Sequence, residues 1–167
     1  MVEIRPFGRM KDKSVEQILL EDYKYFTYIK EEIKIKKPSL KRRFEFVDFV
    51  ANNFISAINC RQCNEKPAEY ISIYNGYGGV RTSSGGFIYC SNDCYSTDPS
   101  VTTENKSTLY PLAFKTTLSA TKGDTNHLAG VIAECMGLKA ERRTKDYLHD
   151  FFNNCRTKTT LNGVLTF

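Results

Sequence analysis

Four cysteines arranged as two close pairs constrain this sequence more than any other feature. Cys60 and Cys63 form a C-x₂-C pair, and Cys90 and Cys94 form a C-x₃-C pair within YCSNDC. The N-terminal residues show no signal-peptide core, and no apolar run approaches the roughly 18 residues of a membrane helix. We therefore expect a cytoplasmic location, where thiols stay reduced and paired cysteines indicate a metal site rather than disulfides.

The donor set predicts which metal is bound and what it does. Zn²⁺ takes four thiolates in a tetrahedron at about 2.3 Å. Four cysteines would fill every coordination position, so no position would remain for water or substrate. The sequence thus predicts a structural zinc site held by Cys60, Cys63, Cys90 and Cys94.

The segment between the two pairs has the pattern of a β-hairpin. AEYISIYN and GGFIYC alternate aromatic and β-branched residues as strands do, and the glycines of NGYGG and SSGG provide turns. A cysteine turn, a hairpin and a second cysteine turn that opens a helix resemble a treble-clef zinc finger. YCSNDC is similar to the FCSxxC element of several such families, although a zinc ribbon could use similar spacing.

The N-terminal residues 5–33 carry a second set of signals. Ser14 and Gln17 form a capping box at a predicted helix start. Apolar residues at helical spacing predict an amphipathic helix over EDYKYFTYIKEEI, with an apolar face of Tyr25, Phe26, Tyr28, Ile29 and Ile33. The stretch resembles the exodeoxyribonuclease X-like C-terminal domain. It departs from that pattern at Asp12, where a glycine is usual, and at Tyr28, where a tryptophan is usual. The matching residues are Pro6, Phe7, Gly8, Arg9, Met10, Lys11, Lys13, Ser14, Ile18, Asp22, Tyr25, Tyr28 and Ile29.

This resemblance implies a nucleic-acid context. In that family the module follows an exonuclease domain or stands alone in small bacterial and phage proteins, where it is accessory rather than catalytic. The exonuclease portion is absent from this sequence. The resemblance therefore implies a DNA or RNA context rather than cleavage, with DNA favoured over RNA as the partner. A small fold that only supports its neighbours remains the alternative.

The densest charge lies at residues 34–43, KIKKPSLKRR, which we call the basic junction. It holds six basic residues and no acidic one. We expect contacts to phosphate, although a solvated basic face is the alternative. Two hairpin tyrosines are expected to stack on bases. The predicted nucleic-acid-binding residues are Arg9, Lys11, Lys13, Lys34, Lys36, Lys37, Lys41, Arg42, Arg43, Tyr74 and Tyr77.

Helical periodicity after Pro38 predicts one long amphipathic helix over residues 39–59 that runs into the first cysteine pair. Its apolar residues are Leu40, Phe44, Val47, Ala51, Phe54, Ile55 and Ile58. If so, zinc would hold the basic junction in place through this helix, and metal removal would weaken nucleic-acid binding.

The C-terminal third reads as mainly helical. A linker is predicted over residues 96–108 from their composition. Helices are predicted over residues 125–137 and 141–155, with Gly137 ending the first of them. A final strand is predicted over residues 160–167.

No catalytic constellation emerges from the sequence. Cys135 shares a predicted helix with His127, and Cys155 shares one with His149. Neither spacing brings the thiol and the imidazole together, so both cysteines are predicted to be core residues. Converging carboxylates for a two-metal nuclease are also not apparent.

Together these patterns predict an α+β protein. Residues 1–59 form a small α/β module with the long helix, residues 60–98 a zinc finger, and residues 99–167 a helical region packed on the rest. The favoured function is non-enzymatic nucleic-acid binding with zinc as cofactor. A protein-interaction adaptor, such as a phage or defence factor that acts on a nucleic-acid enzyme, and a small nuclease are the alternatives.

Overall fold

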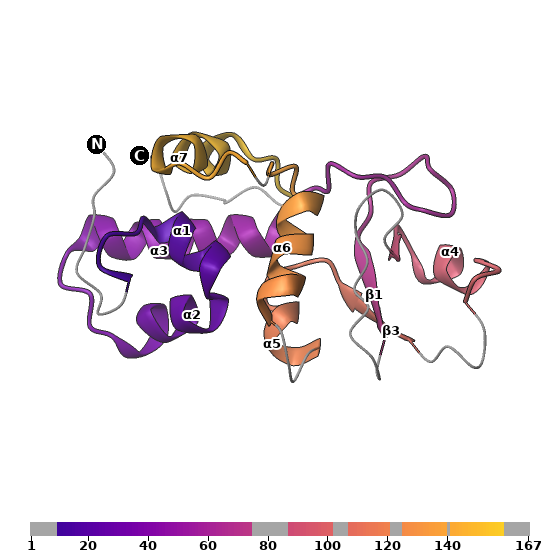
Figure 1. Ribbon diagram of the computed structural model, residues 1–167, viewed down its shortest axis with the longest axis horizontal. Helices are drawn as coiled ribbons and strands as arrows, with labels where there is room; N and C mark the ends of the chain where they lie inside the picture. The colour runs from indigo at the N-terminus through magenta and orange to yellow at the C-terminus, as the bar shows by residue number, and fades with distance from the viewer. Residues whose placement is uncertain (1–9, 75–86, 102–106, 121–124, 140, 159–167) are drawn as a thin grey trace.

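The computed structural model describes residues 10–74, 87–101, 107–120, 125–139 and 141–158, and within them the predicted α+β class is confirmed. Helices gather at one end, the sheet and α4 lie at the other, and α5 and α6 stand between them (Figure 1). The elements in chain order are α1 (Val15–Glu21), α2 (Tyr23–Glu32), α3 (Pro38–Asn53), β1 (Tyr70–Tyr74), β2 (Ile88–Tyr89), α4 (Asn92–Ser96), β3 (Ser107–Pro111), α5 (Thr116–Ala120), α6 (Thr125–Cys135) and α7 (Lys145–Asn154).

The predicted capping box at the start of α1 is confirmed. Ser14 Oγ accepts a hydrogen bond from the Gln17 amide at 3.3 Å, and Gln17 Oε1 accepts one from the Ser14 amide at 3.0 Å. Asp22 then ends α1 and caps α2, since its carboxylate accepts a hydrogen bond from the Tyr25 amide at 2.9 Å. Tyr28 was expected on the apolar face of α2, but it is 52% exposed.

The prediction of one helix over residues 39–59 is wrong at its C-terminal end, because α3 ends at Asn53. From Phe54 the chain is extended and forms a β-bridge with Thr157. The Ile55 amide donates to the Arg156 carbonyl at 2.8 Å, so these backbone groups bond to the C-terminal segment instead of to α3. Ile58, which we expected to pack inward, is 39% exposed.

The sheet has three antiparallel strands in the order β2-β1-β3. The predicted hairpin is confirmed where the structure describes it, with Tyr70 opposite Tyr89. The third strand overturns part of the linker prediction for residues 96–108. Ser107 begins β3 opposite Tyr74, and Asp98 is a buried side chain with specific partners.

The two long C-terminal helices lie within the predicted ranges, but α6 ends at Cys135 and α7 begins only at Lys145, four residues after the predicted start. Gly137 has a φ of +93°, the left-handed conformation that ends α6. In α7, Leu148 and Phe152 are buried, while Tyr147 and Phe151 are half-buried. The strand predicted at residues 160–167 lies outside the described residues.

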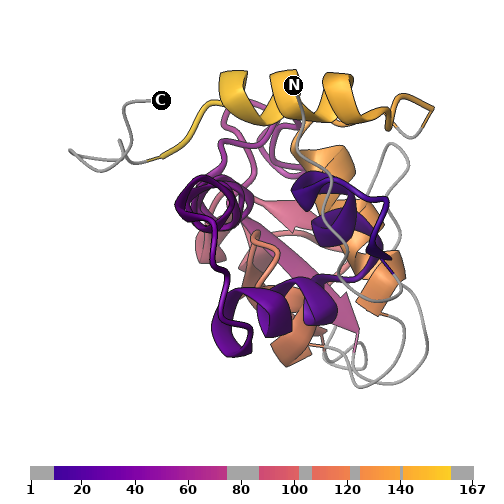
Figure 2. The same cartoon turned by 90° about the vertical axis from the view of Figure 1, so that its left-hand side faces the viewer.

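One hydrophobic cluster joins the two ends of the molecule. It contains Phe26 and Phe44 from the helices, Ile71 and Ile88 from the strands, and Phe114 from the segment after β3. Figure 2 looks along α3 and shows α7 above it and α2 below it. Among the described residues, no helix is long and apolar enough to cross a membrane.

Candidate metal centre

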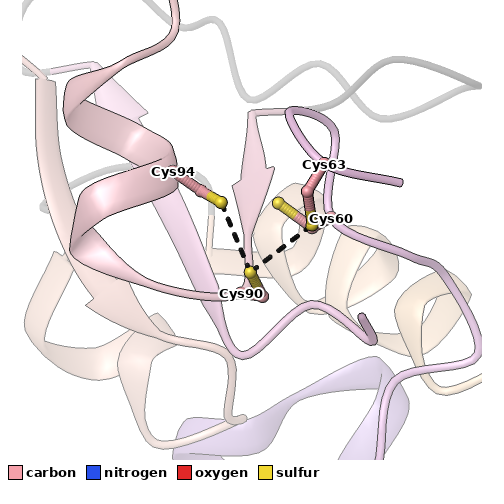
Figure 3. Close-up of side chains that lie close together, drawn as sticks. All are labelled: Cys60, Cys63, Cys90 and Cys94. Carbon is pink, nitrogen blue, oxygen red and sulfur yellow. Dashed lines mark hydrogen bonds between the residues drawn. The ribbon is translucent and has the colours of Figure 1, made fainter. Parts of the chain in front are cut away.

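The four paired cysteines converge on one point. Their Sγ atoms all lie within 4.8 Å of one another, with 3.8 Å between Cys63 and Cys90 and 3.5 Å between Cys90 and Cys94. Figure 3 shows the side chains approaching from the first cysteine turn, from the end of β2 and from α4. Within the part of the chain that the structure describes, this is the only group of three or more potential metal-ligating side chains.

Backbone hydrogen bonds shape the first cysteine turn, residues 60–66. The Cys60 amide donates to the Lys66 carbonyl at 2.7 Å, and the Asn64 amide donates to the Cys60 carbonyl at 2.9 Å. Asn64 has a φ of 54°, a left-handed conformation that asparagine tolerates better than most residues. The turn therefore aims both thiols in the same direction.

The second cysteine turn opens α4. Ser91 is the N-cap residue, and its Oγ accepts a hydrogen bond from the Cys94 amide at 3.2 Å. The Arg61 amide donates to the Ile88 carbonyl at 3.0 Å, which holds the first turn against β2. The two turns are thus fixed relative to each other by backbone contacts as well as by the cluster.

The geometry and the donor set fit a tetrahedral metal ion. A tetrahedron with metal–sulfur bonds of about 2.3 Å has sulfur–sulfur distances of about 3.8 Å. The two Sγ separations given above lie at or close to that value. Thiolate-only tetrahedral sites select zinc or iron over hard cations such as Mg²⁺ and Ca²⁺.

The thiols of the cluster differ in acidity because their surroundings differ. Backbone amides of Glu65 and Lys66 lower the pKa of Cys63 to about 6. Burial raises the pKa of Cys60, but amides that include those of Cys63 and Cys90 outweigh it, so the net shift is downward. Burial raises the pKa of Cys90 to about 12, with hydrogen bonding to Cys94 adding to the effect.

A groove of about 530 Å³ lies beside the cluster and gives solvent access to it. Cys63, Cys90 and Cys94 are among its lining residues, whereas Cys60 is fully buried. A chelator can therefore approach the centre from this side.

The basic junction lies at the other end of α3 from the first cysteine turn. Lys34, Lys36, Lys41 and Arg42 are exposed, and Lys37 is half-buried. The Lys41 side chain lies near Glu45, with 3.9 Å between Nζ and Oε1. These side chains can meet a partner at the surface.

The remaining predicted nucleic-acid-binding residues have different placements. Lys11 is exposed, and Lys13 pairs with Glu21 at 2.8 Å. Arg43 turns inward, because its Nε donates to the buried carboxylate of Glu16 at 2.7 Å. Arg9, Tyr77 and the side chain of Tyr74 lie outside the described residues.

The two cysteines outside the cluster occupy apolar surroundings. Cys135 is fully buried, and burial raises its pKa to about 12. Burial also raises the pKa of Cys155, to about 11. Both thiols are therefore poor nucleophiles at neutral pH.

Sequence reasoning missed Asp98, which is buried beside the metal centre. It lies in a stretch with the composition of a linker, and no local pattern distinguishes it from an exposed turn aspartate.

A scan against protein-family models, a search of curated proteins and a search of solved structures found no match to this chain. The resemblance of residues 5–33 to the exodeoxyribonuclease X-like module and the treble-clef assignment stay predictions.

Proposed function

We propose that this protein is a zinc-containing nucleic-acid-binding protein in which Zn²⁺ has a structural role. The observation that carries the proposal is the convergence of four Sγ atoms, all within 4.8 Å of one another. Four thiolates complete the coordination of Zn²⁺, so the ion joins chain segments and does not activate water or substrate. When bound, it would crosslink the turn at residues 60–66 to β2 and α4.

Metal analysis of the purified protein tests the zinc site. We expect about one Zn²⁺ per chain, and we expect a strong chelator to lower the stability of the fold because metal-binding energy contributes to folding. A protein that is free of metal and keeps the same unfolding midpoint with and without chelator would refute the site.

The proposed contact with nucleic acid is supported by the basic junction at the start of α3. Lys37 is the N-cap residue, without a side-chain cap, Pro38 occupies the first turn, and that turn has no acidic residue. The positive end of the helix dipole therefore adds to the exposed lysines and to Arg42, a combination that favours phosphate. DNA is the favoured polymer because of the family that residues 5–33 resemble.

Binding to duplex DNA, single-stranded DNA and RNA probes at two salt concentrations tests this part. Phosphate contacts release counterions, so the affinity should fall steeply as the salt concentration rises. Absence of binding to all three probes at low salt would refute nucleic-acid binding and leave the zinc site standing.

An adaptor that binds another protein is the second candidate. A groove of about 480 Å³ that includes Met136, Tyr147 and Phe151 among its lining residues favours it. Its binding to a partner would depend on salt much less than phosphate contacts do.

A further inference from the structure

A buried carboxylate connects the two cysteine turns from outside the set of metal ligands. Asp98, which follows α4, is 5% exposed. Its Oδ2 accepts a hydrogen bond from the Tyr89 hydroxyl at 2.9 Å and lies 3.3 Å from Arg61 Nε. Arg61 directly follows Cys60, and Tyr89 directly precedes Cys90. One carboxylate therefore holds the neighbour of a ligand in each turn.

Asp98 is itself fixed on its other side. Its Oδ1 accepts hydrogen bonds from the Ser100 amide at 2.8 Å and from the Ser100 hydroxyl at 2.6 Å. Both carboxylate oxygens are thus used, and the buried charge is opposed by the Arg61 guanidinium. A buried charge with this many partners persists only where the surrounding structure is well ordered.

The two partners of Asp98 are also held in place by ring contacts. Tyr89 is fully buried and packs edge-on against Tyr95, with the ring centroids 5.3 Å apart. The guanidinium of Arg61 lies over the Phe87 ring, 4.9 Å from its centroid. These contacts leave the Asp98 partners little freedom to reorient.

We propose that Asp98 is a positioning residue for the metal centre, which sets the spacing between the two cysteine pairs through Arg61 and Tyr89. The proposal rests on the proposed zinc site. Without Asp98, the backbone bond from Arg61 to Ile88 would still join the two turns. The Arg61 and Tyr89 side chains would lose their shared anchor, so metal binding would have to supply more of the order, and that cost would appear as weaker affinity. Residues that orient metal ligands from outside typically contribute about 10- to 100-fold in metal affinity.

The test compares the Zn²⁺ affinity of Asp98→Asn with that of the wild-type protein, by competition with a chromophoric chelator. Asparagine keeps the shape of the side chain and removes the charge. We expect about a 10- to 100-fold loss of affinity and a changed absorption spectrum of the Co²⁺-substituted protein. Tyr89→Phe removes one hydrogen bond and should weaken Zn²⁺ binding by about 2- to 10-fold, which still tests the proposal if Asp98→Asn does not fold.

The helical end of the molecule offers a matched control. Asp48 accepts a hydrogen bond from the Tyr23 hydroxyl at 3.1 Å and pairs with Lys30 Nζ at 2.7 Å, the same kind of tyrosine–aspartate–cation arrangement. Asp48→Asn should lower fold stability and leave Zn²⁺ affinity and the Co²⁺ spectrum unchanged.

Two results would overturn the role of Asp98. One is wild-type Zn²⁺ affinity in the folded Asp98→Asn and Tyr89→Phe variants, and the other is an equal loss in Asp48→Asn, which would show a general effect of stability. Failure of the wild-type protein to bind Zn²⁺ is a different outcome, because it would refute the proposed zinc site itself.

Discussion

Arg43 on α3 holds the buried carboxylate of Glu16 on α1, with 2.7 Å between Arg43 Nε and Glu16 Oε1. The same guanidinium donates to Asn153 Oδ1 at 2.6 Å and to the His149 carbonyl at 3.4 Å, both on α7. Glu16 is 1% exposed. One arginine thus ties three helices together around a buried charge.

Replacement of Arg43 by Ala should destabilise the protein strongly. Glu16 would remain buried without the Arg43 guanidinium, and loss of one partner of such a pair costs about 3–5 kcal/mol. Urea denaturation measures this loss. The neighbouring exposed Arg42 provides the control, since Arg42→Ala should change the free energy of unfolding by less than about 0.5 kcal/mol. Equal effects of the two substitutions would contradict the pairing described here.

The sequence could not show that the Arg43 side chain points into the protein toward Glu16 rather than into solvent. In KIKKPSLKRR it is one of six similar charges, and its partner Glu16 is distant in the chain. The end of α3 at Asn53 could not be predicted for the same reason. The helical periodicity of apolar residues continues past Asn53, but hydrogen bonds to the distant C-terminal segment end the helix there. Strand β3 depends on a long-range partner as well.

Local signals gave correct predictions. The capping box at Ser14 and the helix stop at Gly137 each depend on a few adjacent residues, and the structure shows both. The grouping of the four cysteines joins residues far apart in sequence, but the close spacing within each pair is itself a local signal of metal ligands. Asp98 lacked any such signal, because its role depends on Arg61 and Tyr89 from other segments.

If zinc binds the four-cysteine cluster, replacing a cysteine inside the cluster should lower the zinc content, whereas replacing one outside it should not. Cys94→Ser should lower the zinc content well below one ion per chain, because Cys94 is part of the cluster. Cys155→Ser, at a half-buried cysteine outside the cluster, should keep the wild-type zinc content. Elemental analysis of both variants, after removal of loosely bound metal, measures the difference. Equal zinc content in the two variants would place the metal elsewhere.

The basic junction predicts a loss of phosphate contacts when its exposed charges are removed. The combined variant Lys36→Ala, Lys41→Ala and Arg42→Ala should bind nucleic acid more weakly on all sequences. The slope of log affinity against log salt should flatten by about 2 to 3, since each contact contributes roughly one unit. Arg43 is left intact because its loss would destabilise the fold.

The control for this variant removes the same number of charges elsewhere. Lys115, Lys139 and Arg156 are exposed and lie outside both the basic junction and the metal centre. Their combined replacement by Ala should leave the salt slope within about half a unit of the wild-type value. If the control variant loses as much affinity as the junction variant, binding depends on net charge rather than on this surface.

The metal centre and the basic junction should respond differently to metal removal. The sequence suggested one helix linking them, but α3 ends at Asn53, and its 16 residues place its start about 24 Å from that end. Contacts from Arg43 to Glu16 and Asn153 hold the start of α3 independently of the cysteines. Chelation should therefore loosen residues 54–74 and 87–98 and leave nucleic-acid affinity within about twofold, a small energetic change.

Limited trypsin digestion and nucleic-acid binding, measured on the same chelated sample, test this separation. Cleavage after Arg61 should accelerate when the metal is removed, because the turn at residues 60–66 loses its crosslink. The Arg43 site should stay protected, since its side chain remains bonded to Glu16 inside the helical end. Readdition of Zn²⁺ should restore resistance at Arg61. A large loss of nucleic-acid affinity on chelation, reversed by Zn²⁺, would show that the metal centre supports the basic junction despite the break after α3.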